Sequence, residues 1–452
     1  MNRIFNMVSE NRLFAVFALF ISWIIPSTGR LIKYKNILKV AYAVNRAKPL
    51  TSSNPVRVRI APTSFCNYRC LFCEIHKYIL LYPKQTKNTI SIEHIKNYES
   101  FLSTSFTLSF FGGTGEPLSN NNFGDIVTYL KKRYGMKMFV NTNASLLNNN
   151  LADIFIRHGF DRILVSYHAG TEDGYKYLMT GNINKVDNNL LYLVQQKEIK
   201  HKKKPVVDFN FAPQKLNAEE YKAILNKAKS LNTGCVLVNR YHGSRNKIQD
   251  KQVSFDHAPA EGNKLLDAIY AYADINNIKL SPAKQQYWSK ENIEIEWNPD
   301  NFNRKKRCFE PWMGLHFNPV LDANNCHLVG VCNRIELFKL YYDKINLNSQ
   351  EQFRKLWNHP LLQYMRETVN SDNTNPICRY CKNPARSSIR NIDAQKYAGI
   401  RDTAIKNFFN KFRKSYDFEE IEGIEVLNEN PNPDEKFQDQ LKGMRPVSDI
   451  RT

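Results

Sequence analysis

Three cysteines stand close together in the segment CNYRCLFC at 66–73, directly after an alternating segment at 56–60. Thiolates bind iron-sulfur clusters and zinc, and Cys66, Cys70 and Cys73 are spaced so that all three can face one metal centre. Three thiolates leave one iron of an iron-sulfur cube without a protein ligand, whereas ferredoxin-type electron carriers provide all four. A zinc site, which would need a fourth ligand from elsewhere, and unrelated core cysteines are the alternatives.

The chain has 452 residues and nine cysteines, and 42% of its residues are hydrophobic. This length suggests about two or three domains with a substantial core, which excludes a chain that is disordered as a whole. Short cysteine spacings without a secretory signal favour metal binding over disulfides. We therefore expect a protein of the reducing cytoplasm.

The formal net charge of +21 invites a nucleic-acid interpretation, because clustered lysines and arginines gain from counterion release at phosphates. Basic residues are scattered over most of the chain, with short runs at 202–204 and 304–307, and no RNA-binding motif accompanies them. A lysine-rich solvated surface explains this distribution better, so a nucleic-acid partner is not expected. A zinc-stabilised nucleic-acid-binding protein remains the rival from another class.

Residues 1–54 contain an apolar run at 13–25 and a basic amphipathic stretch at 30–48. The apolar run is shorter than the roughly 18 residues that a membrane span needs, and no small-x-small cleavage site follows it. We expect two helical segments. They could lie on an anionic membrane surface, which would be the inner membrane surface of the cell, or pack against the rest of the protein.

From residue 56 onward, strand patterns alternate with stretches long enough for helices. Six such units predict an α/β fold whose parallel sheet has right-handed crossovers. The predicted strands are 56–60, 107–111, 137–140, 162–167, 206–211 and 236–239, and the predicted helices are about 91–103, 121–133, 146–158, 184–197 and 218–230.

Residues that directly follow the strands should lie at one edge of such a sheet, where ligands bind. The cysteine segment follows the first strand, and a glycine turn with Glu116 follows the second. An Asn-Thr-Asn turn ending at Asn143 follows the third, where tight-turn formation and ligand binding are both open. Ser166 and His168 end the fourth; His168 is either an acid-base group or, as we prefer, a structural histidine. Asn210 and Asn239 are further candidates, whereas Cys235, which precedes its strand, is read as a small buried apolar residue.

These features together resemble the radical S-adenosylmethionine (SAM) superfamily, through the C-x3-C-x2-C segment with Phe72 before its last cysteine. The resemblance implies a partial (β/α)6 radical SAM barrel over 55–285. It also implies that the open iron of a 4Fe-4S cluster chelates the amino and carboxylate groups of SAM. One electron then cleaves a carbon-sulfur bond, and the 5'-deoxyadenosyl radical abstracts hydrogen from a substrate. A reductant such as flavodoxin or ferredoxin is an expected partner.

The same resemblance implies a role for each matching residue. Cys66, Cys70 and Cys73 would hold the cluster, and the glycine turn would hold the amino group of SAM, although Thr114 and Gly115 separate Gly113 from Glu116 where the family has adjacent residues. The residues expected to bind SAM are Phe72 near the adenine, Gly112, Gly113, Gly115, Glu116, Asn143 and Ser166.

A second cysteine group lies between residues 305 and 395, beyond a linker at 286–304. A cysteine followed by Pro-Trp, a later cysteine, a Leu-Trp-Asn segment and a closing C-x2-C resemble the SPASM or twitch domain of radical SAM enzymes. This implies a small cysteine-rich domain with one auxiliary 4Fe-4S cluster; a structural zinc site is the alternative. The expected ligands are Cys308, Cys332, Cys378 and Cys381, with Cys326 as a further candidate that we prefer to read as inert.

Residues 396–452 should form a short basic helix at 402–412 and a flexible acidic tail, disordered or loosely packed over 419–439. The substrate is not encoded in these motifs. Peptide or protein modification ranks marginally ahead of chemistry on a lipid or small metabolite.

Overall fold

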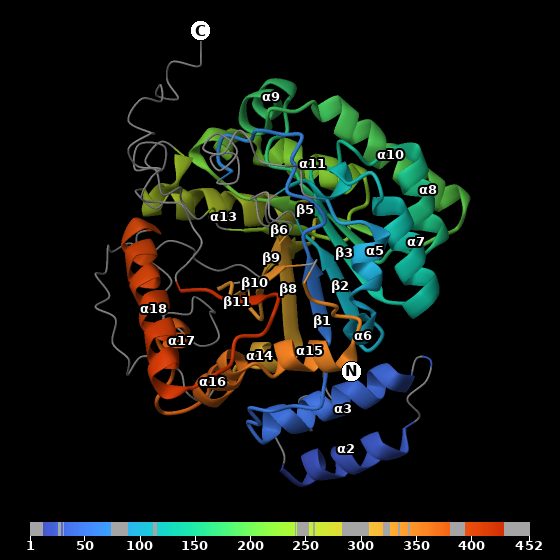
Figure 1. Cartoon of the computed structure of the whole chain (residues 1–452). Helices are drawn as coiled ribbons and strands as arrows, with labels where there is room; N and C mark the ends of the chain where they lie inside the picture. The colour runs from blue at the N-terminus through green and yellow to red at the C-terminus, as the bar shows by residue number, and fades with distance from the viewer. Residues whose placement is uncertain are drawn as a thin grey trace.

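The computed structural model describes residues 12–25, 29, 31–73, 89–111, 115–239, 241, 253–255, 258–282, 307–319, 326–332, 335–341, 344–379 and 394–428. Its centre is an 11-stranded sheet with the strand order β11-β10-β9-β8-β1-β2-β3-β4-β5-β6-β7. Figure 1 shows helices α7, α8 and α10 along one side of the parallel strands.

Seven strands in this sheet run parallel to one another in chain order. The first six confirm the predicted strands to within two residues at either end, and β7 is an additional short strand that sequence patterns did not predict. Their bounds are β1 Arg57–Ile60, β2 Thr107–Phe110, β3 Lys137–Thr142, β4 Arg162–Ser166, β5 Val206–Phe211, β6 Val236–Val238 and β7 Leu280–Ser281.

The connecting helices follow the predicted alternation, with three differences, one of which is the unpredicted helix α13 Pro259–Ile275. The helix predicted at 91–103 is divided into α5 Ile92–Lys96 and α6 Glu99–Leu102, and the unpredicted helix α9 Glu172–Met179 lies between β4 and α10. The other helical elements of this region are η1 Pro117–Ser119, α7 Phe123–Tyr134, α8 Asn149–Arg157, α10 Ile183–Ile199, η2 Lys215–Glu220 and α11 Tyr221–Ser230.

Alternation along β1 shows how the sheet is built. Val58 and Ile60 are buried in the main hydrophobic core, whereas Arg57 and Arg59, which point to the opposite face, are only partly buried. Strands β2 and β3 repeat this pattern, with Leu108 buried toward the helices. One face of the sheet therefore packs under the helices, and the other carries polar and charged side chains into the interior of the barrel.

The region expected as a separate domain at 305–395 continues the sheet of the barrel. Strand β8 Gly314–Pro319 pairs in parallel with β1, and β9 Cys326–Gly330 and β10 Phe338–Tyr341 follow as antiparallel neighbours. The helices of this region are α14 Glu310–Met313, α15 Gln350–Trp357, α16 Pro360–Thr368 and α17 Pro376–Arg379.

The C-terminal region is more ordered than expected. The short helix predicted at 402–412 is α18 Ala394–Ser415, and strand β11 Ile424–Val426 pairs antiparallel with β10. The expectation of a loosely packed tail is wrong for β11, because Ile424 and Leu427 are buried against the core. Residues 429–452, the rest of the expected tail, lie outside the described residues.

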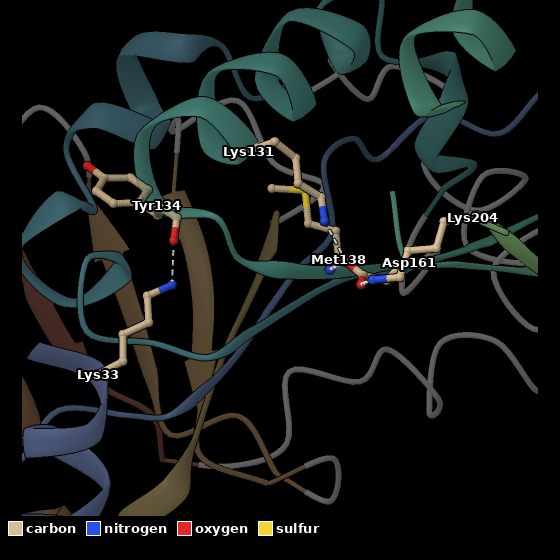
Figure 2. Close-up of polar contacts among 6 residues, drawn as sticks. All are labelled: Lys33, Lys131, Tyr134, Met138, Asp161 and Lys204. Carbon is tan, nitrogen blue, oxygen red and sulfur yellow. Dashed lines mark hydrogen bonds and ion pairs between the residues drawn. The ribbon is translucent and has the colours of Figure 1, made fainter. Parts of the chain in front are cut away.

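The two predicted N-terminal helices are present as α2 Arg12–Ile24 and α3 Leu31–Asn45. Helix α3 packs against the start of the barrel, where Lys33 donates a hydrogen bond of 2.6 Å to the backbone oxygen of Tyr134 (Figure 2). In Figure 1, α2 lies on the side of α3 away from the sheet.

Asp161 directly precedes β4 and holds together the segments at the N-terminal ends of the neighbouring parallel strands. Its carboxylate accepts from the backbone nitrogen of Met138 at 2.9 Å and lies 2.5 Å from the ammonium groups of both Lys131 and Lys204 (Figure 2). Burial acts to raise the pKa of Asp161, but the hydrogen bonds from the two lysines hold it below its ordinary value. This cluster ties α7, β3, β4 and the segment before β5 together.

Candidate active site

A cavity of about 180 Å³ opens where β1, β2, β3 and β4 end. The three cysteines of the first group share this cavity with most of the residues expected to bind SAM, although the loops that carry them are far apart in the chain. The lining residues are Cys66, Tyr68, Cys70, Phe72, Cys73, Gly115, Glu116, Pro117, Asn141, Thr142, Asn143, Ser166, His168 and Met179.

The cysteine loop is held from the side by the C-terminal turn of α9. The backbone nitrogen of Arg69 donates to the hydroxyl of Thr180 at 2.6 Å, and the thiol of Cys70 contacts the backbone oxygen of Met179 at 3.4 Å. Thr180 adopts a left-handed conformation with φ of 56°, which ends the helix at this point. Sequence patterns missed α9, although the Ser/Thr cap signal at Thr171 could have indicated its start.

The glycine turn packs directly on the backbone that precedes the first cysteine. The backbone nitrogen of Glu116 donates to the oxygen of Phe65 at 2.8 Å. A Cβ atom on Gly115 would lie 2.5 Å from that same oxygen and 2.7 Å from the oxygen of Thr63. Gly115 is therefore required for the close approach of the two loops, and it also lines the cavity, so its expected contact with SAM stays a prediction. Gly112 and Gly113 lie outside the described residues.

Glu116 is buried, with 4% of its surface exposed, and its carboxylate is held in one orientation. It accepts from the backbone nitrogens of Leu118 at 3.0 Å and Asn143 at 2.9 Å, and from the hydroxyl of Thr142. Burial raises its pKa to about 7, although these three hydrogen bonds act in the opposite direction. The turn after β2 thus presents a preoriented carboxyl group that is locked to the end of β3.

Asn143 has a structural role within the site. Its side-chain nitrogen donates to Asn67 of the cysteine loop at 3.0 Å, and its side-chain oxygen accepts from the backbone nitrogen of Ser145 at 3.0 Å. Ala144 stands in the left-handed region with φ of 59°. Asn143 therefore forms the turn that sequence reasoning left open and, at the same time, lines the cavity.

Phe72 and His168 form one aromatic wall of the cavity. Their rings meet edge to face with centroids 5.0 Å apart, and Tyr241 packs against Phe72 at 6.2 Å. His168 is buried, and its Nδ1 accepts from the backbone nitrogen of Ala212 at 3.1 Å. Burial lowers its pKa to about 4, so His168 is neutral at physiological pH and fits the preferred structural interpretation.

The remaining sequence candidates do not line this cavity. Asn239 donates to Asn210 at 2.5 Å, which joins the ends of β5 and β6. Cys235 is buried ahead of β6, and its backbone nitrogen donates to Asp208 at 2.9 Å. The interpretation of Cys235 as a small buried residue agrees with this position.

The thiols of the first group are chemically suited to an iron-sulfur cluster. Burial raises the pKa of Cys66 to about 12 and that of Cys70 well above its ordinary value. Across the described residues, no three Cys, His, Asp or Glu side chains already stand as a finished metal site. Ligation by iron would supply the positive charge that buried thiolates need, so the donor set of Cys66, Cys70 and Cys73 fits such a cluster.

Two of the auxiliary candidates, Cys308 and Cys378, pack against one apolar cluster that includes Trp312 and Val369. The backbone nitrogen of Cys308 donates to Asn370 at 2.8 Å. Cys332 packs against the main core instead, in a bridge with Ile335. Cys381 and the side chain of Cys326 lie outside the described residues, so the four-ligand set remains a prediction.

Comparison with known proteins finds one family that is similar to part of the chain. Residues 60–232 match the model of the Radical SAM superfamily, so this part of the chain is similar to a radical SAM domain. The superfamily implies a 4Fe-4S cluster and SAM as cofactors. No curated protein matches this chain.

Two solved structures of SuiB from Streptococcus suis have a similar fold. The structure bound to S-adenosylmethionine has 14% sequence identity, covers 75% of this chain and 74% of its own, and gives a TM-score of 0.51. The structure bound to the precursor peptide SuiA has 13% identity, covers 79% and 77%, and gives a TM-score of 0.52. At this identity the likeness shows the fold alone.

Proposed function

We propose that this protein is a radical SAM enzyme that abstracts a hydrogen atom from a peptide or protein. Cys66, Cys70 and Cys73 would hold a 4Fe-4S cluster, which would supply the electron for reductive cleavage of SAM to methionine and the 5'-deoxyadenosyl radical. The single observation that carries the proposal is the cavity that Cys66, Cys70 and Cys73 share with Glu116 and Phe72. These residues come from two loops that only the folded sheet brings together.

Each side chain has one task in this proposal. The three thiolates ligate the cluster, and the oriented carboxylate of Glu116 accepts from the amino group of SAM. Phe72 packs against the adenine. Ser166 and the backbone around Asn143 contact the rest of SAM. Gly112 and Gly113, which lie outside the described residues, stay predicted to bind SAM.

The peptide substrate is supported by the precursor peptide in a SuiB structure of similar fold. A lipid or small metabolite is the alternative substrate for the same chemistry. The zinc-stabilised nucleic-acid-binding alternative loses support, because the parallel barrel and the family match explain the cysteine loop without it.

An auxiliary 4Fe-4S cluster in the C-terminal region completes the proposal, with Cys308, Cys332, Cys378 and Cys381 as ligands. A flavodoxin or ferredoxin delivers the electron, and the reducing cytoplasm is the compartment. The cysteines whose side chains are described are all free thiols, which is compatible with metal ligation.

Helix α2 supports association with an anionic membrane surface. Its exposed side chains include Phe17 at 62%, Phe20 at 56% and Trp23 at 70% exposure, and Arg46 and Lys48 are exposed after α3. Exposed aromatic residues and basic residues are the two types that bind at the boundary between lipid headgroups and acyl chains. Within the described residues, no helix has the length and apolar character needed to cross a bilayer.

The proposed function is tested by reductive SAM cleavage. Anaerobically reconstituted protein, reduced with dithionite, should convert SAM to 5'-deoxyadenosine. Cys70→Ala should reduce this product to the level of a protein-free control, because one cluster ligand is lost. Cys235→Ala, a buried thiol outside the cavity, is the matched control and should retain cleavage. Absence of cleavage by wild-type protein with a full iron content would refute the proposal.

A further inference from the structure

A second cavity, of about 570 Å³, lies inside the barrel and shares Asn141 with the cavity of the cysteines. Its volume falls in the usual range for sites that bind small molecules or single substrate groups. The lining residues are Arg59, Ser109, Phe110, Phe111, Phe139, Val140, Asn141, Arg162, Leu164, His316 and Glu336.

Two arginines on the wall of this cavity occupy aligned register positions of the sheet. Strand register aligns Arg59 with Ser109, Ser109 with Phe139, and Phe139 with Arg162, so these residues form one row across β1 to β4. The register continues from Arg59 to His316 on β8. Because alternate residues of a strand share a face, this row points into the barrel and places two guanidinium groups around one space.

Arg162 is held in position by Asp208 on the neighbouring strand β5. Asp208 is buried, with 1% of its side chain exposed, and forms an ion pair with Nη1 of Arg162. The side chain of Arg162 is 45% exposed, and Asp208 does not line the cavity. The guanidinium is thus anchored by a buried carboxylate, while the partly exposed Arg162 side chain lines the cavity.

The wall of the cavity carries two arginines and one carboxylate, and the rest of it is largely apolar. The charged residues on the wall are Arg59, Arg162 and Glu336, and the carboxylate of Glu336 lies 3.7 Å from the ring of His316. Much of the remaining wall is aromatic or aliphatic, including Phe139 and Leu164. A guanidinium group binds carboxylates and phosphates through paired hydrogen bonds, and does so more strongly where water is excluded.

We propose that this cavity binds a substrate group that carries an oxyanion, a carboxylate or a phosphate, through Arg59 and Arg162. The inference rests on the proposed function and adds the chemical class of the substrate. Asn141 lines both cavities, so an anion held by the two arginines would place the adjoining part of the substrate next to the SAM cavity. The anion orients the substrate, and the neighbouring carbon then meets the radical.

Equilibrium dialysis tests this directly, with radiolabelled succinate and inorganic phosphate as probes. The full-length, reconstituted protein is used with SAM present and without reductant. We expect one of the two probes to bind at one per chain, and Arg59→Gln to weaken it tenfold or more. Arg162→Lys retains a cation beside Asp208, which protects folding, but removes the paired donors and should weaken binding severalfold. Arg157→Gln, exposed on α8, is the matched control and should bind like wild type.

Binding of succinate alone would assign a carboxylate, and binding of phosphate alone would assign a phosphate. The inference is overturned if neither probe binds at concentrations about tenfold above the concentration of SAM that saturates the protein. It is also overturned if Arg59→Gln and Arg162→Lys both bind the probe like wild type. SAM cleavage is measured on the same preparations. Cleavage without anion binding would refute this inference alone, whereas anion binding without cleavage would refute the proposed function.

Discussion

The protonation state of the Glu116 carboxyl group should control the affinity for SAM. Its pKa is raised to about 7 by burial, so the carboxylate that should accept from the amino group of SAM forms only as the pH rises through this value. We expect SAM to bind the reconstituted protein up to about tenfold more weakly at pH 6 than at pH 8, since one pH unit corresponds to tenfold protonation. Isothermal titration calorimetry under anaerobic conditions measures this difference.

Glu116→Gln provides the control for this prediction. The amide cannot ionise, so its SAM affinity should be low and nearly the same at both pH values. A variant that keeps the wild-type pH dependence would assign the effect to another group. The stability effect has a defined sign: because the folded pKa is raised, the stabilising contribution is complete below the ordinary carboxyl pKa and is lost as the pH rises through about 7.

At Gly115, the turn after β2 packs against the backbone that precedes the cysteine loop, and this contact positions the two loops of the site. A Cβ atom here would meet backbone atoms of Phe65 and Thr63, which cannot move without shifting the cysteine loop. We expect Gly115→Ala to lower the free energy of unfolding by about 1–3 kcal/mol, as overpacking does, and to reduce iron incorporation at the first site. Thermal unfolding and iron analysis measure the two effects.

Gly124→Ala is the matched control for Gly115→Ala. The added Cβ would approach the Cδ1 atom of Ile154 at 2.9 Å, and this is the flexible end of a side chain. Because alanine also favours the helical conformation of α7, stability should change little or improve. Equal losses of iron in both variants would argue against a specific role for the close approach at Gly115.

The exposed face of α2 makes a second prediction at this scale. Replacing Phe17 and Trp23 together with serine should reduce co-sedimentation with vesicles of phosphatidylglycerol and phosphatidylcholine at least severalfold, because two exposed aromatic side chains are lost. Replacing Ile199 and Ile275, which are 68% and 80% exposed elsewhere, gives the comparison and should leave vesicle binding unchanged. Full retention of binding by the α2 variant would exclude this face as the contact.

In the whole molecule, the first cysteine group and the pair Cys308 and Cys378 lie at opposite ends of β1. The first group follows β1, whereas Cys308 and Cys378 pack with Val56, which directly precedes it. We expect Cys378→Ala to lower the iron content from about eight to about four per chain, the difference of one 4Fe-4S cluster, and to leave SAM binding intact. Iron and sulfide analysis with a SAM-binding measurement tests this. Loss of all iron would mean that the two sites depend on each other.

The C-terminal region is part of the same sheet as the barrel, so it packs as an integral part of the fold. Strand β8 covers the edge of β1, and Trp312 donates from its indole nitrogen to the backbone oxygen of Lys48 at 2.8 Å. Arg366, fully buried, donates to the backbone oxygens of Pro311 and Pro49. The N-terminal segment, the barrel and the C-terminal helices are therefore packed as one body around the start of β1.

The sequence alone determined the alternation of strands and helices, because residue periodicity reports local burial. It also located the cysteine loop, Glu116 and Asn143 after successive strands, where topology brings them to one edge. Only the tertiary structure decided which distant segments meet. The turn of α9 holds Cys70, the backbone of Phe65 packs against Gly115, and one row of the sheet joins Arg59 to Arg162. Such contacts depend on register and loop packing between distant segments, and no local pattern encodes them.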